Sequence, residues 1–166
     1  MLFRSRANLA LAALVLSVMG ASTIDAMAEG PSSRPAKVIF VCLHGSVKSQ
    51  IATAHFNRLA SERGLSYVAL SRGMEVDKSI PASIRQGLAG DGLAPASETP
   101  ESLTAFEAGD AVKVFAFDAV PSELRGESEV TYWSDVPPAT KDYEAARSAI
   151  VRHIEEILAT LPQTKP

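Results

Sequence analysis

The chain of 166 residues has only one cysteine, Cys42, and no excess of basic side chains. A single cysteine cannot form a disulfide within the chain, so its thiol is free and needs an explanation. With 16 Lys and Arg against 19 Asp and Glu, and no run of basic residues, the sequence lacks the electrostatic features of proteins that bind nucleic acid or anionic lipid. No pair or trio of His, Cys and Asp has the spacing of metal ligands, so we expect no bound metal.

The N-terminal segment has the order of features found in secretory signal peptides. Arg4 and Arg6 precede an apolar run at residues 9–20, which is followed by small residues and an Ala-Met-Ala triplet that ends at Ala28. A membrane-spanning helix needs about 20 apolar residues, and this run is shorter, so cleavage is favoured over retention as an anchor. We therefore expect a signal peptide at 1–28 that is cleaved after Ala28, leaving a secreted or periplasmic protein without a stable membrane span.

The rest of the chain is expected to form one domain. A composition of 46% apolar and 21% charged residues is sufficient to bury a core. Residues 29–36 combine glycine, proline and serine and favour an extended linker. The predicted organisation is therefore this linker, a domain at 37–162 and a tail at 163–166.

The hydrophobic pattern alternates between strands and helices. Apolar runs predict strands at 38–41, 67–70, 112–117 and 130–133, and helical spacing predicts helices at 48–63, 80–93 and 143–161. Strands that alternate with helices are joined by right-handed crossovers into a parallel sheet with both faces covered. The predicted fold class is therefore α/β, a three-layer αβα sandwich.

The candidate catalytic residues lie at the turn between the first strand and the first helix. Ligands of such sheets bind beyond the carboxyl ends of the strands, which is where Cys42 stands. A loop that enters a helix aims successive N–H groups at one point, and this arrangement binds a tetrahedral oxyanion and stabilises a thiolate. Lys48 adds positive charge, Ser49 can bond a thiolate, and Gly45 permits a backbone angle closed to other residues. These residues predict a cysteine nucleophile beneath a phosphate-sized pocket.

Residues 42–49, with the strand before them and Gln-Ile-Ala at 50–52, resemble the signature loop of the low-molecular-weight protein tyrosine phosphatases and of the arsenate reductases that share their fold. The resemblance covers residues 37–161 and implies a four-stranded parallel sheet of order 2-1-3-4. It also implies a general acid before the last helix, where Asp135 stands in Trp-Ser-Asp-Val-Pro. The loop residues assigned to substrate binding are Leu43, His44, Gly45, Ser46, Val47 and Ser49.

Four positions depart from the family pattern. Lys48 stands where the family has arginine, and a point charge on a flexible stem aligns phosphoryl oxygens less well than a planar fork. Val47 replaces a neighbouring cysteine, and without a second cysteine the disulfide cycle of thioredoxin-coupled arsenate reductases is impossible. His44 and Gly45 replace the usual Gly-Asn, which removes an amide that would brace the loop.

The resulting hypothesis is an exported phosphomonoester hydrolase that needs no cofactor and acts on a phosphorylated small molecule or a phosphotyrosine protein. Cys42 attacks phosphorus, the loop N–H groups and Lys48 hold the oxygens, and Asp135 protonates the leaving oxygen and then activates water. Two alternatives stay open. One is reduction of an inorganic oxyanion, arsenate, with an external thiol. The other is a degenerate module that binds phosphate without turnover.

Several of these side chains also have a plainer interpretation. Cys42 can be a small buried hydrophobe, Asp135 a turn residue, and Lys48 an exposed side chain in the first helical turn. His44 either lines the pocket or faces solvent. Packing in the core or a position on the surface is the simpler interpretation for His55, His153, Tyr132 and Trp133. The last two are also candidates for the wall of a substrate cleft.

Overall fold

The computed structural model describes residues 34–162. The expected signal peptide at 1–28, most of the expected linker at 29–36 and the expected tail at 163–166 lie outside the described residues. Within the described range, no helix is both long and apolar enough to cross a membrane.

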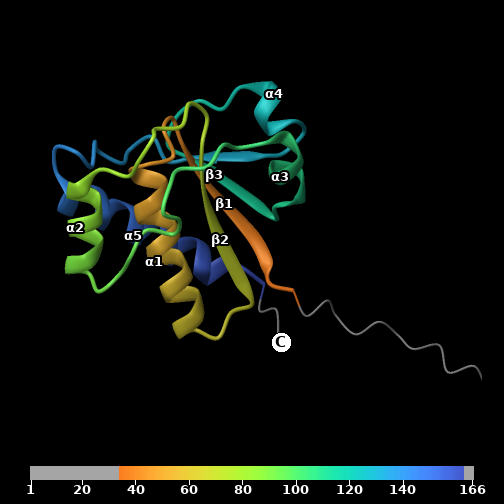
Figure 1. Cartoon of the computed structure of the whole chain (residues 1–166). Helices are drawn as coiled ribbons and strands as arrows, with labels where there is room; N and C mark the ends of the chain where they lie inside the picture. Colours follow the sequence, from red (N-terminus) through yellow and green to blue (C-terminus); the bar gives the residue numbers. More distant parts are fainter. Residues whose placement is uncertain (1–33, 163–166) are drawn as a thin grey trace, which may run out of the picture. The chain divides into compact units, whose positions relative to one another are not determined.

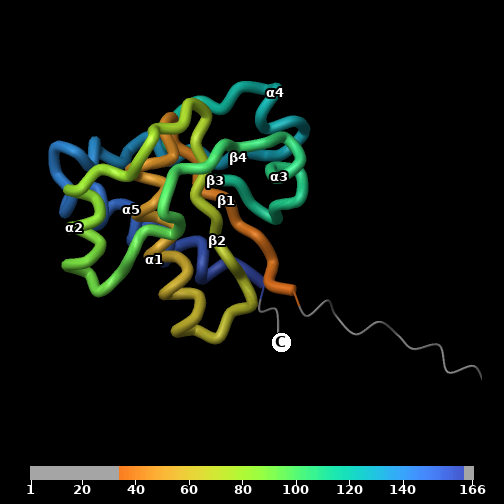
Figure 2. Tube along the Cα trace, in the orientation of Figure 1, coloured from red at the N-terminus to blue at the C-terminus, as the bar shows by residue number. Residues whose placement is uncertain are grey.

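The described chain alternates strands and helices, as the hydrophobic pattern predicts. Its elements are β1 (Ala36–Cys42), α1 (Lys48–Glu62), β2 (Tyr67–Gly73), α2 (Ala82–Gly90), α3 (Ala105–Asp110), β3 (Lys113–Ala116), α4 (Ser122–Arg125), β4 (Val130–Tyr132) and α5 (Tyr143–Thr160). The strands pair in parallel in one sheet of order β2-β1-β3-β4, which confirms the predicted fold class and strand order. Figure 2 shows β1 running beside β2 through the centre of the trace.

Strand β1 is buried on both faces because its central residues are all apolar. Successive side chains of a strand point to opposite faces of a sheet. Val38 and Phe40 pack in a core cluster with residues of α1, α2 and α5, whereas Ile39 and Val41 pack in a second cluster with residues of α3 and α4. The sheet is therefore the middle of three layers, with α1, α2 and α5 on one face and α3 and α4 on the other (Figure 1).

The structure differs most from the sequence-based elements at β2, α2, α3 and α4. β2 continues to Gly73, three residues past the expected strand at 67–70, and its added residues Ser71 and Arg72 are buried although they are polar. α2 is shorter than the expected helix at 80–93. α3 and α4 were not predicted, because six and four residues are too few for a helical apolar pattern to emerge.

Arg72 is tolerated in the core because two carboxylates neutralise it. Its Nη2 donates to Glu107 Oε1 at 2.7 Å, and its Nη1 lies 2.9 Å from Glu101 Oε2. The hydrogen bonds from Arg72 lower the pKa of the Glu107 carboxyl and outweigh the opposing effect of its burial. The interaction joins the end of β2 to α3 on the second face of the sheet.

This ion pair predicts a pH-dependent stability. Because the folded state lowers the pKa of Glu107, the carboxylate stabilises the fold at neutral pH, and this contribution disappears as the pH falls through the folded pKa. Glu107→Gln should lower the free energy of unfolding at pH 7 by roughly 1–2 kcal/mol. Urea titrations at several pH values should show the difference from wild type closing below pH 4.5, the ordinary pKa of the group.

The control for this experiment is Glu123→Gln, which changes an exposed carboxylate on α4 that has no ion pair within residues 34–162. This variant should match wild type at every pH. An equal loss for Glu107→Gln at pH 7 and at pH values below 4.5 would contradict the interpretation, because it would show that the charge of Glu107 is not what stabilises the fold.

Candidate active site

The thiol of Cys42 lies at the end of a chain of two hydroxyl groups. Cys42 ends β1, is 4% exposed, and has its Sγ 3.1 Å from Ser49 Oγ at the start of α1. Ser71 Oγ of β2 donates to the same Ser49 oxygen at 2.9 Å. Because Ser71 supplies its hydrogen to Ser49, the hydrogen of Ser49 is free to point at sulfur. This order of donors lets Ser49 act as the hydrogen-bond donor to the Cys42 sulfur.

The loop after Cys42 lies against the end of β2 through two glycines. Gly45 has φ 65°, in the left-handed region. A Cβ at Gly45 would lie 2.9 Å from Gly73 N, and a Cβ at Gly73 would lie 2.6 Å from Gly45 N. Both positions therefore need glycine, because the two backbones touch where side chains would otherwise stand.

The carbonyl groups of residues 43–45 bond to one side of the loop. The contacts are Leu43 O with the N–H groups of Met74 (2.9 Å) and Glu75 (2.8 Å), His44 O with the N–H of Asp77 (3.2 Å), and Gly45 O with Gln50 Nε2 (2.9 Å). In a trans peptide the C=O and the following N–H point in opposite directions. The N–H groups of residues 44–46 therefore point to the other side of the loop, and no group within residues 34–162 accepts them. Successive N–H groups turned to one side form a site for an oxyanion.

The side chains of His44 and Ser46 stabilise this loop geometry by bonding to the segment after β2. Ser46 Oγ donates to Asp77 Oδ2 at 2.5 Å. His44 Nδ1 lies 2.9 Å from Glu75 O, and since a carbonyl only accepts, Nδ1 is the donor. The side chains of His44 and Ser46 are therefore occupied by these bonds. Their backbone N–H groups are the donors that an anion could use.

The structure brings one carboxylate to the loop that sequence reasoning missed. Asp118 Oδ2 accepts the N–H of Leu43 at 2.9 Å. Asp118 follows Phe117, whose N–H bonds to Val41 O and extends the pairing of β3 with β1. As the first polar residue after the expected strand at 112–117, Asp118 stands at the same carboxyl edge as Cys42, and this position was the available signal.

Lys48 occupies the first position of α1 and has its ammonium 5.3 Å from the centre of the Phe117 ring. An aromatic face attracts a cation without using its hydrogen-bond donors. Within residues 34–162, Lys48 forms no salt bridge. The Lys48 ammonium therefore lies beside the N-terminus of α1, with N–H donors that no carboxylate within residues 34–162 uses.

Asp135 bonds to α5 rather than to the loop. Its carboxylate accepts from Arg152 Nη2 at 2.9 Å and from His153 Nε2 at 2.8 Å. The hydrogen bond from His153 lowers the pKa of Asp135. A general acid must carry a proton, so Asp135 has to leave this pair before it can serve as one.

The remaining predicted side chains are distributed between core and surface. Trp133 packs against Phe40 and Phe115 in the core, and its ring stacks on His153 with 4.7 Å between centroids. Tyr132 is exposed, and Val47 packs at the edge of the same core. His55 is buried against Asp91 on the α1 side of the sheet.

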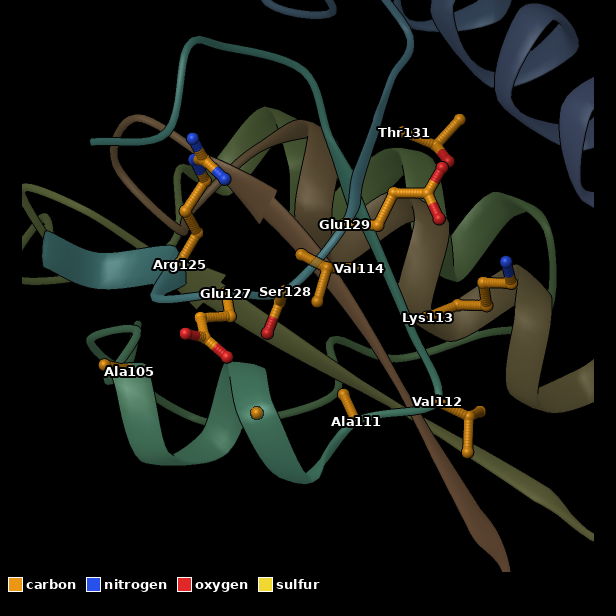
Figure 3. A pocket seen from close by; sticks show the side chains of 11 residues that line it. Ala105, Ala111, Val112, Lys113, Val114, Arg125, Glu127, Ser128, Glu129 and Thr131 are labelled. Carbon is orange, nitrogen blue, oxygen red and sulfur yellow. The ribbon is translucent and has the colours of Figure 1, made fainter. Parts of the chain in front are cut away.

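A separate cavity of about 360 Å³ lies between α3, α4 and the amino ends of β3 and β4 (Figure 3). Its walls carry charges of both signs from Lys113, Arg125, Glu127 and Glu129, and no thiol or imidazole. Since β3 runs parallel to β1, this cavity and Cys42 are at opposite ends of the sheet. No group of three His, Cys, Asp or Glu side chains within residues 34–162 could hold a metal ion.

The geometry around Cys42 agrees with the comparison of the sequence with known families. The family model of low molecular weight phosphotyrosine protein phosphatase matches residues 37–124. The chain belongs to this family. Membership in the phosphotyrosine phosphatase family supports a phosphatase-like or arsenate-reductase-like enzyme. A search of curated proteins found no match.

Solved structures of phosphatases and of an arsenate reductase share the fold. The low molecular weight protein tyrosine phosphatase from T. tengcongensis superposes with a TM-score of 0.68 at 17% identity, over 76% of this chain and 99% of that one. The arsenate reductase from Archaeoglobus fulgidus has a TM-score of 0.61 and 26% identity, over 74% and 98%. A Cys-to-Ser mutant of the YwlE arginine phosphatase from Bacillus subtilis, with a phosphorylated active site serine, has a TM-score of 0.67 and 17% identity, over 75% and 95%.

The hydroxyl chain predicts the reactivity of the thiol. Ser71→Ala removes the donor that fixes Ser49, so alkylation of Cys42 by iodoacetate at pH 7 should slow by roughly three- to tenfold, the equivalent of about one hydrogen bond. The exposed α1 residue Ser61, changed to alanine, is the matched control and should react like wild type. An unchanged rate in folded Ser71→Ala would show that Ser71 does not influence the sulfur.

Proposed function

We propose that the protein is an exported phosphomonoester hydrolase of the tyrosine phosphatase type that forms a cysteinyl-phosphate intermediate. The observation that carries the proposal is the loop after β1. There Ser49 can donate to the sulfur of Cys42 while the N–H groups of residues 44–46 turn to one side without acceptors in the described chain. Family membership supports the same chemistry.

Two displacements at phosphorus account for the reaction. The Cys42 thiolate attacks phosphorus, so that the S–P bond forms while the bond to the leaving oxygen breaks and a carboxyl group gives that oxygen a proton. Water then attacks phosphorus, loses a proton to the carboxylate and releases phosphate and the thiolate. The loop N–H groups and the Lys48 ammonium hold the oxygens in both steps. The phosphorylated serine in the YwlE mutant supports a covalent intermediate in this fold.

The substrate class is a phosphorylated small molecule or a phosphotyrosine protein. Recognition of the phosphoryl group rests on the backbone N–H groups of His44, Gly45 and Ser46, with Val47 and Ser49 in the same loop. The N–H of Leu43, which the sequence also assigned to the substrate, donates to Asp118 instead. The signal-peptide features at 1–28 support a secreted or periplasmic location.

Two observations favour rival functions. The 26% identity to the Archaeoglobus fulgidus arsenate reductase favours arsenate reduction, in which an external thiol would have to attack the arsenylated Cys42 sulfur and release arsenite. Lys48 in place of arginine favours a module that binds phosphate without turnover.

One set of assays separates these functions. We expect the purified protein to hydrolyse p-nitrophenyl phosphate, and Cys42→Ser to lose this activity by at least about a thousandfold while it still binds phosphate, because serine is not ionised near neutrality. Phosphate binding without hydrolysis in wild type would favour the binding module. Arsenite production with added glutathione, in the absence of hydrolysis, would favour the reductase.

The leaving-group acid has two candidates. Asp135 is the acid proposed from the sequence, but in the structure it pairs with Arg152 and His153. Asp118 is the second candidate because it bonds to Leu43, the residue next to the nucleophile. A proton donor matters most for poor leaving groups, so the two assignments give different patterns across substrates.

Matched variants decide between them. We expect Asp118→Asn to slow alkyl phosphates at least about tenfold more than p-nitrophenyl phosphate, because only the alkoxide needs the proton. Asp135→Asn should slow both substrates equally and slightly. A selective loss in Asp135→Asn alone would assign the acid to Asp135 and would mean that the loop after β4 leaves α5 during turnover.

A further inference from the structure

Two consecutive residues after β3 contact both ends of the loop that follows Cys42. Asp118 Oδ2 accepts the N–H of Leu43 at 2.9 Å. The ring of Phe117 lies 5.3 Å from the ammonium of Lys48. Phe117 and Cys42 belong to the same core cluster, on the face of the sheet that α1 covers. The ring therefore holds the ammonium at the carboxyl edge of the sheet, on the same face as the thiol.

The position of Lys48 is unfavourable for a cation when no anion is bound. Lys48 is the first residue of α1, and the N-terminal end of a helix carries partial positive charge. Within residues 34–162 no carboxylate pairs with the ammonium. Its flexible stem also gives it many possible directions. A contact that keeps the ammonium in one place is therefore important for this side chain.

The ring of Phe117 is fixed by the core behind it. Phe117 is buried and packs in a T-shaped arrangement with Trp133, with 5.7 Å between ring centres. Trp133 packs in turn on Phe40 and Phe115. A close-packed ring keeps one orientation, so its face offers the ammonium a fixed place.

An aromatic ring holds a cation in a way that a carboxylate cannot. The face of the ring attracts the ammonium through its negative quadrupole and leaves the positive charge and the three N–H donors available. A carboxylate at the same place would neutralise the charge and accept from the donors. The contact with Phe117 therefore orders Lys48 without removing the properties that an oxyanion requires.

We propose that Phe117 is a positioning residue that holds the Lys48 ammonium ready for the oxygens of a phosphoryl group. This inference rests on the proposed function, in which Lys48 binds those oxygens. The planar fork of an arginine fixes two oxygens by its own shape, whereas a lysine needs a neighbour to keep its direction. Phe117 is this neighbour in a chain whose loop has lysine.

NMR of the protein without ligand tests the position of the ammonium. Protons above the face of an aromatic ring resonate upfield. The ε-CH₂ signals of Lys48, identified by their loss in Lys48→Met, should therefore lie upfield of those of the other lysines. Phe117→Leu should return them to the ordinary position. Signals at the ordinary position in wild type would overturn the proposal, and this result would not depend on whether the loop binds phosphate.

Titration with inorganic phosphate tests the effect on the loop, and the amide signals of residues 44–46 report the binding. Phe117→Leu should weaken it about two- to fivefold, the range of one cation–π contact. The matched control is Phe115→Leu, which removes a ring that also packs on Trp133 but has no cation contact within residues 34–162. This control should bind phosphate like wild type. Equal losses in both variants, or tighter binding in Phe117→Leu, would overturn the proposal.

A double-mutant cycle separates positioning from packing. In the Lys48→Met background, Phe117→Leu should have little or no effect on phosphate binding, because the ring acts through the ammonium. A further two- to fivefold loss in that background would refute the proposal, since it would show that the ring acts through the core. Loop amides of wild type that do not respond to phosphate would instead count against the proposed function.

Discussion

The backbone contact between Gly45 and Gly73 is the constraint on which the site depends. It places the loop directly on the end of β2, so that the segment after β2 can donate to the carbonyl oxygens of Leu43 and His44. Those bonds turn the following N–H groups to the other face of the loop. The same contact brings Ser71 next to Ser49, and through it to the sulfur. One close approach of a loop to a strand thus positions both the thiol of Cys42 and the N–H groups of the loop.

Much of this architecture could be predicted from apolar residues alone. The buried run of β1 and the long apolar stripe of α5 mark their elements because their spacing matches one regular structure. The end of β2 could not be predicted in this way, since Ser71 and Arg72 are buried by partners that lie far away in the sequence, Ser49 and Glu107. Strand order came from a family resemblance, because no pattern within a single strand specifies its neighbours.

The same distinction applies to the candidate site. Positions fixed by regular structure could be predicted from the sequence, whereas the partners of charged side chains could not. The position of Cys42, the turn at Gly45 and the contact with Ser49 follow from a strand that leads through a short loop into a helix. Charged side chains are harder to place, because a long side chain can reach several partners at similar cost. Asp135 pairs with Arg152 and His153 on a helix, whereas Asp118, on another loop, reaches the signature segment. Sequence order identified the edge of the sheet but not which carboxylate bonds to the loop after Cys42.

The single thiol has a consequence for the chemical durability of the protein. A thiolate that reacts with peroxide becomes a sulfenic acid, and proteins with a nearby second cysteine recover it as an internal disulfide. Cys42 has no such partner anywhere in the sequence. Its oxidised form is recovered through a thiol from another molecule; otherwise a second equivalent of peroxide oxidises it to the sulfinic acid, which is not reversed by thiols. The lifetime of the reactive centre is therefore set by the reductants of its surroundings rather than by its own fold.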